Sequence, residues 1–229
     1  MASKAHVWLA KTLSYEFNDA KLLQQALTHR SCPGPNNERL EFLGDSVLGA
    51  VISELVFNSH ANAPEGDLSR LRASLVNTTS LGELAADIGL GDHLLLGGGE
   101  RKSGGHRRES ILADALEAVF GAVYIDAGFE VAAEVIKTAF GERLLNLPSV
   151  ADLRDPKTRL QEWLQARSLG LPDYKLIKTS GKAHKQVFEV ACFVKDRSLT
   201  TTGFGTTRRN AEQESAEKML AALTETAAS

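Results

Sequence analysis

Apolar residues recur at helical spacing through the first 145 residues and predict a series of helices. Residues 5–30 show this pattern, and Asn18 is expected to cap a segment at 19–28. After a loop at 32–37, further helices are predicted at about 38–58, from a cap at Asp67 through Val76, and at 79–88, 109–127 and 130–145. Five glycines in residues 97–108 predict an irregular loop, and no strand is predicted before residue 150. This part of the chain should therefore be all-α.

The pattern changes after a connector expected at 148–156. Short runs rich in β-branched and aromatic residues predict strands between two helices. The predicted elements are a helix at 156–167, strands at 174–179, 186–194 and 198–203, and a closing helix at 208–223. The α-β-β-β-α order predicts a small α+β domain with both helices on one face of its sheet.

Composition divides the chain at the same place. Of its 229 residues, 43% are apolar and 24% charged, which are ordinary values for globular domains. Residues 1–150 carry 13 basic and 19 acidic side chains, whereas residues 151–229 carry 13 and 10. An acidic part joined to a basic part indicates a metal-binding domain followed by a polyanion-binding domain in the same chain. No apolar run approaches about 18 residues, residues 1–17 lack a signal-peptide core, and Cys32 and Cys192 lie in unrelated contexts, so we expect a cytoplasmic protein without a membrane span.

Three acidic residues share one face of the predicted helix at 38–58. Glu38, Glu41 and Asp45 are offset by three and seven positions, which places them within about 60° of one another. Phe42 and Leu48 flank this side, so the helix is apolar nearly all round and is expected to be buried. Aligned acids on a buried helix repel one another and lose solvation, which destabilises the fold unless a cation compensates.

A second acidic pair, Asp114 and Glu117, lies on the predicted helix at 109–127. Small residues beside the pair, including Gly121, would let the helix at 38–58 approach closely, and the acids of both helices would then converge. An oxygen-only cluster suits a hard cation such as Mg²⁺ or Mn²⁺. A solvated acidic face is the alternative for either motif alone, but the two motifs together favour a metal site.

Five segments together resemble bacterial ribonuclease III. They are QALTHRS (25–31), NERLEFLGDSVL (37–48), EGDLSRLRASLV (65–76), GERKSGGHRRESILADALEA (99–118) and DPKTRLQEWLQ (155–165). They follow the family's order and extend over nearly the whole chain. The resemblance implies an all-helical catalytic and dimerisation domain at 1–147, a linker at 148–154 and a double-stranded-RNA-binding domain at 155–225.

The resemblance also implies roles for single residues. The positions that match the family's metal ligands are Glu41, Asp45, Asp114 and Glu117, with Asp45 and Glu117 in the catalytic roles. Glu38 and Glu65 match acids that assist at the cleavage site. Phe42 matches an aromatic residue of the family's dimer interface, and core packing is an alternative that can hold as well. The implied cofactor is Mg²⁺, with Mn²⁺ as a substitute, and the implied partners are double-stranded RNA and a second copy of the chain.

Basic and polar positions match RNA contacts of the family. In the second domain they are Gln161 and Gln165 on the first helix, His184 and Lys185 in a loop, and Arg208 and Arg209 before the last helix. The two arginines replace a common lysine pair, which keeps the donors to phosphate. Plain surface polarity is the alternative for each contact alone. The cations Arg101, Lys102, Arg107 and Arg108 could lie near the RNA backbone or on an ordinary surface loop.

The resemblance implies an enzyme that cuts double-stranded RNA, leaving 5′-phosphate and 3′-hydroxyl ends with short 3′ overhangs. Its expected substrates are rRNA precursors and other structured transcripts, including mRNA and tRNA. Two alternatives stay open, namely a non-catalytic double-stranded-RNA-binding regulator and a metal hydrolase acting on a nucleotide or another phosphate ester.

Overall fold

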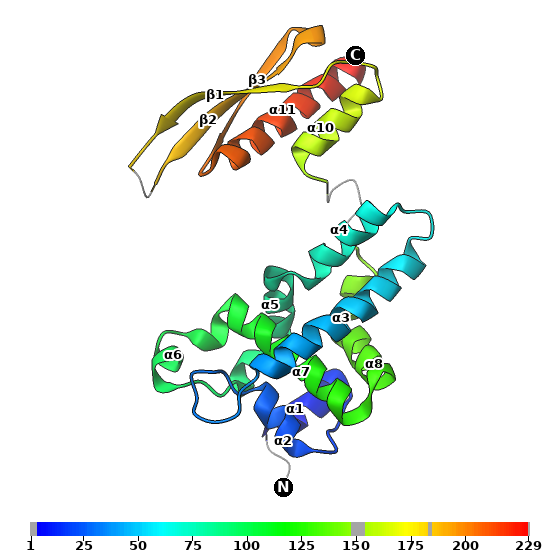
Figure 1. Ribbon diagram of the computed structural model, residues 1–229, viewed down its shortest axis with the longest axis vertical. Helices are drawn as coiled ribbons and strands as arrows, with labels where there is room; N and C mark the ends of the chain where they lie inside the picture. Colours follow the sequence, from blue (N-terminus) through cyan, green and yellow to red (C-terminus); the bar gives the residue numbers. More distant parts are fainter. Residues whose placement is uncertain (1–3, 148–153, 183–184, 229) are drawn as a thin grey trace. The chain divides into compact units, whose positions relative to one another are not determined.

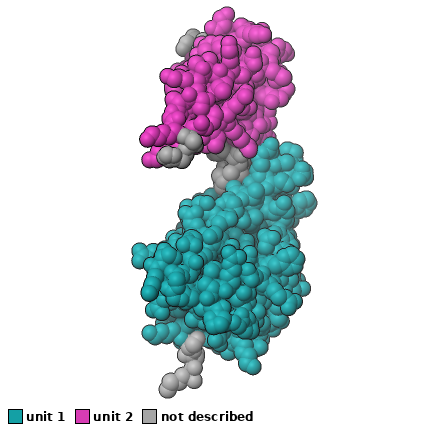
Figure 2. All heavy atoms as spheres, turned by 60° about the vertical axis from the view of Figure 1, so that its left-hand side comes forward, with its two compact units in different colours: residues 1–148 teal, residues 149–229 magenta. Residues whose placement is uncertain are grey.

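The computed structural model describes residues 4–147, 154–182 and 185–228 (Figure 1). The chain forms two compact units, Met1–Pro148 and Ser149–Ser229 (Figure 2). The predicted linker at 148–154 falls almost entirely outside the described residues. Within the described ranges, no helix combines the length and apolarity needed to cross a bilayer.

The first unit is helical, as the sequence predicts. Its helices are α1 (Lys4–Leu13), α2 (Ala20–Ala26), α3 (Glu38–Ser59), α4 (Glu65–Val76), α5 (Thr78–Asp87), α6 (Gly98–Lys102), α7 (Glu109–Ala127) and α8 (Phe129–Phe140). Short 3-10 turns follow three of them, namely η1 (Leu90–His93), η2 (Gly105–Arg107) and η3 (Gly141–Leu144). Strand-like pairing in the described part of this unit is limited to one isolated bridge, between Thr28 and Leu95.

Helix α7 forms the centre of this unit and packs most extensively against α3 (Figure 1). Eleven of its residues, from Ile111 to Val123, are buried. Two glycines allow the contact, because a Cβ on Gly44 would overlap the carbonyl oxygen of Glu117, and one on Gly121 would overlap that of Leu40. The predicted close approach of these two helices is therefore confirmed, and it brings their acidic residues together.

The helical region predicted at 5–30 contains two helices, and its cap differs from the prediction. Asp19 caps α2, because its side chain accepts a hydrogen bond from the Lys21 amide at 2.9 Å. The backbone N–H groups of Asn18 and Asp19 both donate to the carboxylate of Asp126, at 2.7 and 2.9 Å. A partner more than 100 residues away in sequence thus fixes this turn, and a local pattern cannot reveal such a partner.

Helix α4 also begins earlier than predicted. It starts at Glu65, directly after Pro64, so Asp67 lies in its first turn and is not its cap. Asp67 is buried and pairs with Arg70 at 3.0 Å. The fixed φ of proline favours a helix start at this point, which explains the shift.

The glycine-rich segment at 97–108 is not irregular, so that prediction is wrong. It contains α6 and η2, with Gly104 at φ +80° between them. A side chain on Gly97 would collide with Ser31, and one on Gly105 would collide with Glu100. Two of the glycines therefore serve close packing, which the count of glycines alone does not reveal.

The second unit has the predicted α-β-β-β-α order. Its elements are α10 (Pro156–Gln165), β1 (Asp173–Ser180), β2 (Val187–Val194), the turn η4 (Lys195–Arg197), β3 (Leu199–Gly205) and α11 (Arg208–Ala228). The strands form an antiparallel sheet in the order β1-β2-β3, in which Cys192 pairs with Tyr174 and Thr201. Helix α11 packs on β2 and β3, and α10 packs on α11 (Figure 1). Their shared core consists of Leu160, Leu164, Cys192, Val194, Ala216, Met219 and Leu223.

Candidate active site

Three acidic residues from α3 and α7 meet where these helices touch. Carboxylate oxygens of Glu41, Asp114 and Glu117 lie within 4.8 Å of one another, and all three residues are half-buried. We call these three residues the acidic cluster. The convergence predicted from the sequence is present for them, and the cluster offers only carboxylate oxygens as ligands.

Burial and mutual repulsion make the charged form of the acidic cluster unfavourable. Burial, followed by the charges of Asp45, Glu41 and Asp114, raises the pKa of Glu117 to about 8. Burial and then the charge of Asp114 raise the pKa of Glu41, and burial raises that of Asp114. A divalent cation would offset these charges, and carboxylate oxygens are the ligands that Mg²⁺ and Mn²⁺ prefer. The residues therefore fit a site for a hard cation.

Asp45 lies beside the acidic cluster and is exposed. It is not among the three residues whose oxygens lie within 4.8 Å of one another. Its charge is nevertheless the largest contribution of any neighbouring residue to the raised pKa of Glu117. Asp45 therefore acts electrostatically on the acidic cluster without being one of its members.

A polar cleft of about 620 Å³ opens next to the acidic cluster. It is lined by His29, Arg30, Ser31, Asn37, Glu38, Glu41, Glu100, Arg108, Ser110, Ile111 and Asp114. Glu38 is exposed on its wall, where it accepts a hydrogen bond from Asn36 Nδ2 at 3.0 Å and pairs with Arg30 at 3.5 Å. Glu38 therefore belongs to the cleft but not to the acidic cluster.

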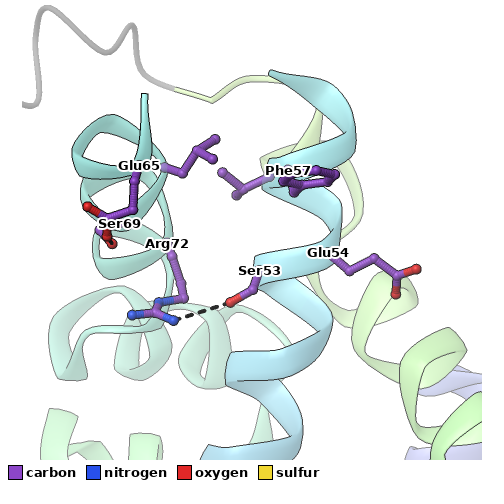
Figure 3. A pocket seen from close by; sticks show the side chains of 8 residues that line it. Ser53, Glu54, Phe57, Glu65, Ser69 and Arg72 are labelled. Carbon is purple, nitrogen blue, oxygen red and sulfur yellow. Dashed lines mark hydrogen bonds between the residues drawn. The ribbon is translucent and has the colours of Figure 1, made fainter. Parts of the chain in front are cut away.

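Glu65 lies in a different place from the other predicted acids. It lines a groove of about 430 Å³ between α3 and α4, and it accepts a hydrogen bond from Ser69 Oγ at 2.7 Å (Figure 3). Arg72 donates to Ser53 Oγ at 3.3 Å on the same groove. Within one chain, Glu65 therefore does not line the polar cleft and does not belong to the acidic cluster.

Phe42 is exposed, with 78% of its surface accessible to solvent. Core packing within one chain, the alternative considered for this residue, is therefore wrong. The expectation of a helix buried on all sides is wrong for the same reason, although Leu48 is fully buried. An apolar side chain at helical spacing can face a partner molecule as well as a core, and the sequence pattern does not distinguish them.

The predicted RNA contacts of the second unit are on its surface. Gln161, Gln165, Lys185, Arg208 and Arg209 are exposed, whereas His184 lies outside the described residues. The Arg208 guanidinium pairs with Glu212 at 3.0 Å, which holds it at the beginning of α11. These placements are compatible with contacts to RNA.

Both parts of the chain match known protein families. Residues 19–144 match the family described as Ribonuclease-III-like, and residues 156–223 match the Double-stranded RNA binding motif. The chain belongs to the ribonuclease III family. Ribonuclease 3 of Alkalilimnicola ehrlichii is 52% identical over 215 residues, which cover 94% of each chain. Ribonuclease 3 of Hahella chejuensis is 53% identical over 215 residues, 94% of this chain and 95% of the relative.

A solved nuclease domain supports the same assignment. The crystal structure of the nuclease domain of ribonuclease III from Campylobacter jejuni is 44% identical and has a TM-score of 0.60, covering 64% of this chain and 100% of that one. As a member of the ribonuclease III family, the chain is a metal-dependent endoribonuclease with a double-stranded-RNA-binding motif. The predicted fold class and family are confirmed.

Sequence reasoning assigned no role to three cleft residues, Arg30, Glu100 and Ser110. Each lies in one of the segments that resemble ribonuclease III, a short distance in sequence before a predicted acid. Their position on the cleft wall depends on how the segment after α2, α6 and the first turns of α7 come together. The signal in the sequence was therefore only their membership of those segments.

Proposed function

We propose that this ribonuclease III hydrolyses both strands of double-stranded RNA at the polar cleft. Glu41, Asp45, Asp114 and Glu117 would hold the metal, and Asp45 and Glu117 would be the catalytic residues. The observation that carries the proposal is the acidic cluster, in which burial and neighbouring charges raise the pKa of Glu117 to about 8. Such an arrangement is typical of a catalytic site, because it destabilises the protein without its ion.

Mg²⁺ is the proposed ion, with Mn²⁺ as a substitute, because the donors are carboxylates only. When bound, it supplies an activated water and neutralises charge on the phosphate. The cluster residues would hold it through their carboxylate oxygens, and the contact of Gly44 with α7 keeps those oxygens together. Asp45 is exposed beside the cluster and would orient the attacking group, and Glu38 would assist from the cleft wall. The expected products carry 5′-phosphate and 3′-hydroxyl ends.

The second unit would hold the duplex. Gln161 and Gln165 are four residues apart and exposed on α10, where they can reach 2′-hydroxyls in a shallow minor groove. Lys185, Arg208 and Arg209 are exposed cations that can contact phosphates. The role of His184 stays a prediction from the sequence.

A dimer would explain the exposed face of α3. Phe42 and Phe57 are 78% and 66% exposed, and small residues, including Gly49, lie between them on the same face. Phe42 of one copy can enter the groove between α3 and α4 of another, whose lining includes Phe57 and Leu68 (Figure 3). Because Glu65 lines that groove, the same contact would bring it towards the other copy's active site. A solved Campylobacter jejuni nuclease domain is described by a flexible region involved in dimer formation.

Two active sites in such a dimer would cut the two strands and leave short 3′ overhangs. The proposed substrates are rRNA precursors and other structured transcripts, including mRNA and tRNA, and the proposed compartment is the cytoplasm. These assignments rest on the family and on the RNA-binding motif at 156–223.

A cleavage assay on a long, perfectly paired RNA tests the proposal. We expect shortening only with Mg²⁺ or Mn²⁺, to products with 5′-phosphates, and none for single-stranded RNA or duplex DNA. Glu117→Gln should abolish cutting and leave duplex binding in a gel-shift assay largely intact. A native protein that shifts the duplex but never cuts it would instead identify a non-catalytic RNA-binding regulator. Cutting of simple phosphate esters but not of RNA would identify a different hydrolase.

A further inference from the structure

Two arginines line the polar cleft beside the acidic cluster. Arg30 pairs with Glu38 at 3.5 Å, and Arg108 pairs with Glu100 at 2.7 Å. Their side chains are 70% and 50% exposed, respectively. Both cations are therefore paired with carboxylates of the cleft wall, and both remain accessible to a ligand that enters the cleft.

Ion pairs between exposed side chains contribute little to stability, so stability alone does not account for these two contacts. A guanidinium can hold a phosphate through two parallel N–H donors, and such charge-assisted pairs are among the strong hydrogen bonds. An RNA phosphate can therefore replace Glu38 or Glu100 as the partner of each arginine.

The two arginines stand at different positions relative to the acidic cluster. Arg30 lines the polar cleft together with Glu41 and Asp114, so it lies close to the proposed metal ligands. Arg108 directly precedes α7 and lies six residues before Asp114, a separation of about 9 Å along a helix axis. An RNA strand in the cleft would thus meet them with different phosphates.

The structure separates Arg108 from the other cations of segment 97–108. Arg101 lines another cleft, together with Cys32 and His106. Arg107 donates from Nε to His106 Nε2 at 3.0 Å. Arg101 and Arg107 lie in the same glycine-rich segment as Arg108, yet neither lines the polar cleft. Arg107 therefore serves as a control of equal charge next to Arg108.

We propose that Arg30 and Arg108 bind backbone phosphates next to the bond that is cut. Glu38 and Glu100 hold the two guanidiniums in place until RNA displaces them. The arginines are positioning residues, because they fix the strand and do not touch the reacting atoms. The proposal rests on the proposed function, since it assigns substrate contacts in the same cleft.

Single-turnover cutting of a paired RNA hairpin by the full chain with Mg²⁺ tests the proposal. Rates at increasing enzyme concentration give the maximal rate and the half-saturating concentration separately. For Arg108→Gln and for Arg30→Gln, we expect the half-saturating concentration to rise about tenfold, as for loss of one charge-assisted hydrogen bond. The dependence of log affinity on log salt should become less steep by about 0.9 for each lost phosphate contact. The maximal rate should change little, because a contact to a non-reacting phosphate acts equally before and in the transition state.

Three further variants distinguish phosphate binding from a structural role. Glu100→Gln breaks the same ion pair but frees Arg108, so it should lower the half-saturating concentration, by up to about fivefold. Arg108→Lys should keep the native salt dependence and recover part of the affinity, because it retains the charge but not the two-pronged geometry. Arg107→Gln should leave both quantities near their native values. Thermal melting of each variant checks that it is folded.

Two results would overturn the proposal. One is Arg108→Gln with the native half-saturating concentration and salt dependence, in a preparation whose native protein cuts RNA. The other is Glu100→Gln with the same loss as Arg108→Gln, which would show that the ion pair itself matters. A native protein that does not cut paired RNA would refute the proposed function first, so the two failures are distinguishable.

Discussion

Replacing Glu117 by glutamine should stabilise the protein when no divalent metal is present. The side chain is half-buried in the acidic cluster, and burial together with the charges of Asp45, Glu41 and Asp114 raises its pKa to about 8. Glutamine has nearly the same shape and carries no charge at any pH. The substitution therefore removes the unfavourable ionisation and leaves the packing of α7 intact.

The magnitude follows from the difference between the pKa of Glu117 in the folded and unfolded states. Folding raises this pKa from 4.5 to about 8, so the protonated form is favoured and stability falls as the pH rises through this window. At pH 7, about 2.5 units above the ordinary pKa of a glutamate, the raised pKa destabilises the folded state by up to about 3 kcal/mol. For a unit of roughly 150 residues, 3 kcal/mol corresponds to roughly 6–12 °C in melting temperature.

Thermal melting followed by circular dichroism, with EDTA present, measures this difference. We expect Glu117→Gln to melt above the native protein at pH 7 and close to it at pH 5, where the effect is below about 1 kcal/mol. Adding Mg²⁺ should raise the native melting temperature more than that of the variant, because metal bound only to the folded state stabilises it. Glu83→Gln, at an exposed position on α5, is the matched control and should change little. Equal melting of native protein and Glu117→Gln at pH 7 in EDTA would refute the reasoning.

Three other substitutions test the packing, the dimer and the RNA surface. Gly44→Ala should force α3 away from α7, destabilise the unit by about 2 kcal/mol or more in thermal melting and abolish cutting in the cleavage assay. Gly99 has open space around it, so Gly99→Ala should leave both the melting temperature and the cutting rate near their native values. Phe42→Ala should shift the protein to monomer in sedimentation without loss of helicity, because the side chain is 78% exposed; an unchanged dimer would contradict this. Replacing Arg208 and Arg209 together by glutamine should make the salt dependence of duplex binding less steep by about 1.8, and an unchanged slope would exclude them as phosphate contacts.

Elements with continuous apolar periodicity were predictable from the sequence. The helix predicted at 109–127 corresponds to α7, and the one predicted at about 38–58 differs from α3 by a single residue at its end. Their apolar residues recur over five or more turns, and glycine follows α7 directly, so both the type and the end of that element are encoded locally. The small residues near Glu117 also predicted correctly that another helix would pack there.

Local patterns failed where a distant group decides the structure. Segment 97–108 was expected to be irregular because glycine disfavours regular structure, yet two of its glycines are required by close contacts with Ser31 and Glu100. Asn18 is a good cap by residue type, but Asp126 holds the backbone N–H groups of Asn18 and Asp19, and the turn so fixed leaves Asp19 as the cap. These contacts become visible only when the folded chain is seen.

The sequence by itself determined the fold class through its apolar periodicity and the family through the segments that resemble ribonuclease III. It also determined the chemistry of the donors, because helical spacing places Glu41 with Asp45 and Asp114 with Glu117 on common faces. Only the tertiary structure decided which side chains meet. It joins Glu41 to Asp114 and Glu117, puts Glu65 in another groove, and places Arg108 but not Arg101 in the polar cleft. The physical reason is that spacing along a helix is set by local backbone geometry, whereas the distance between helices is set by packing, here by two glycines that let α3 and α7 touch.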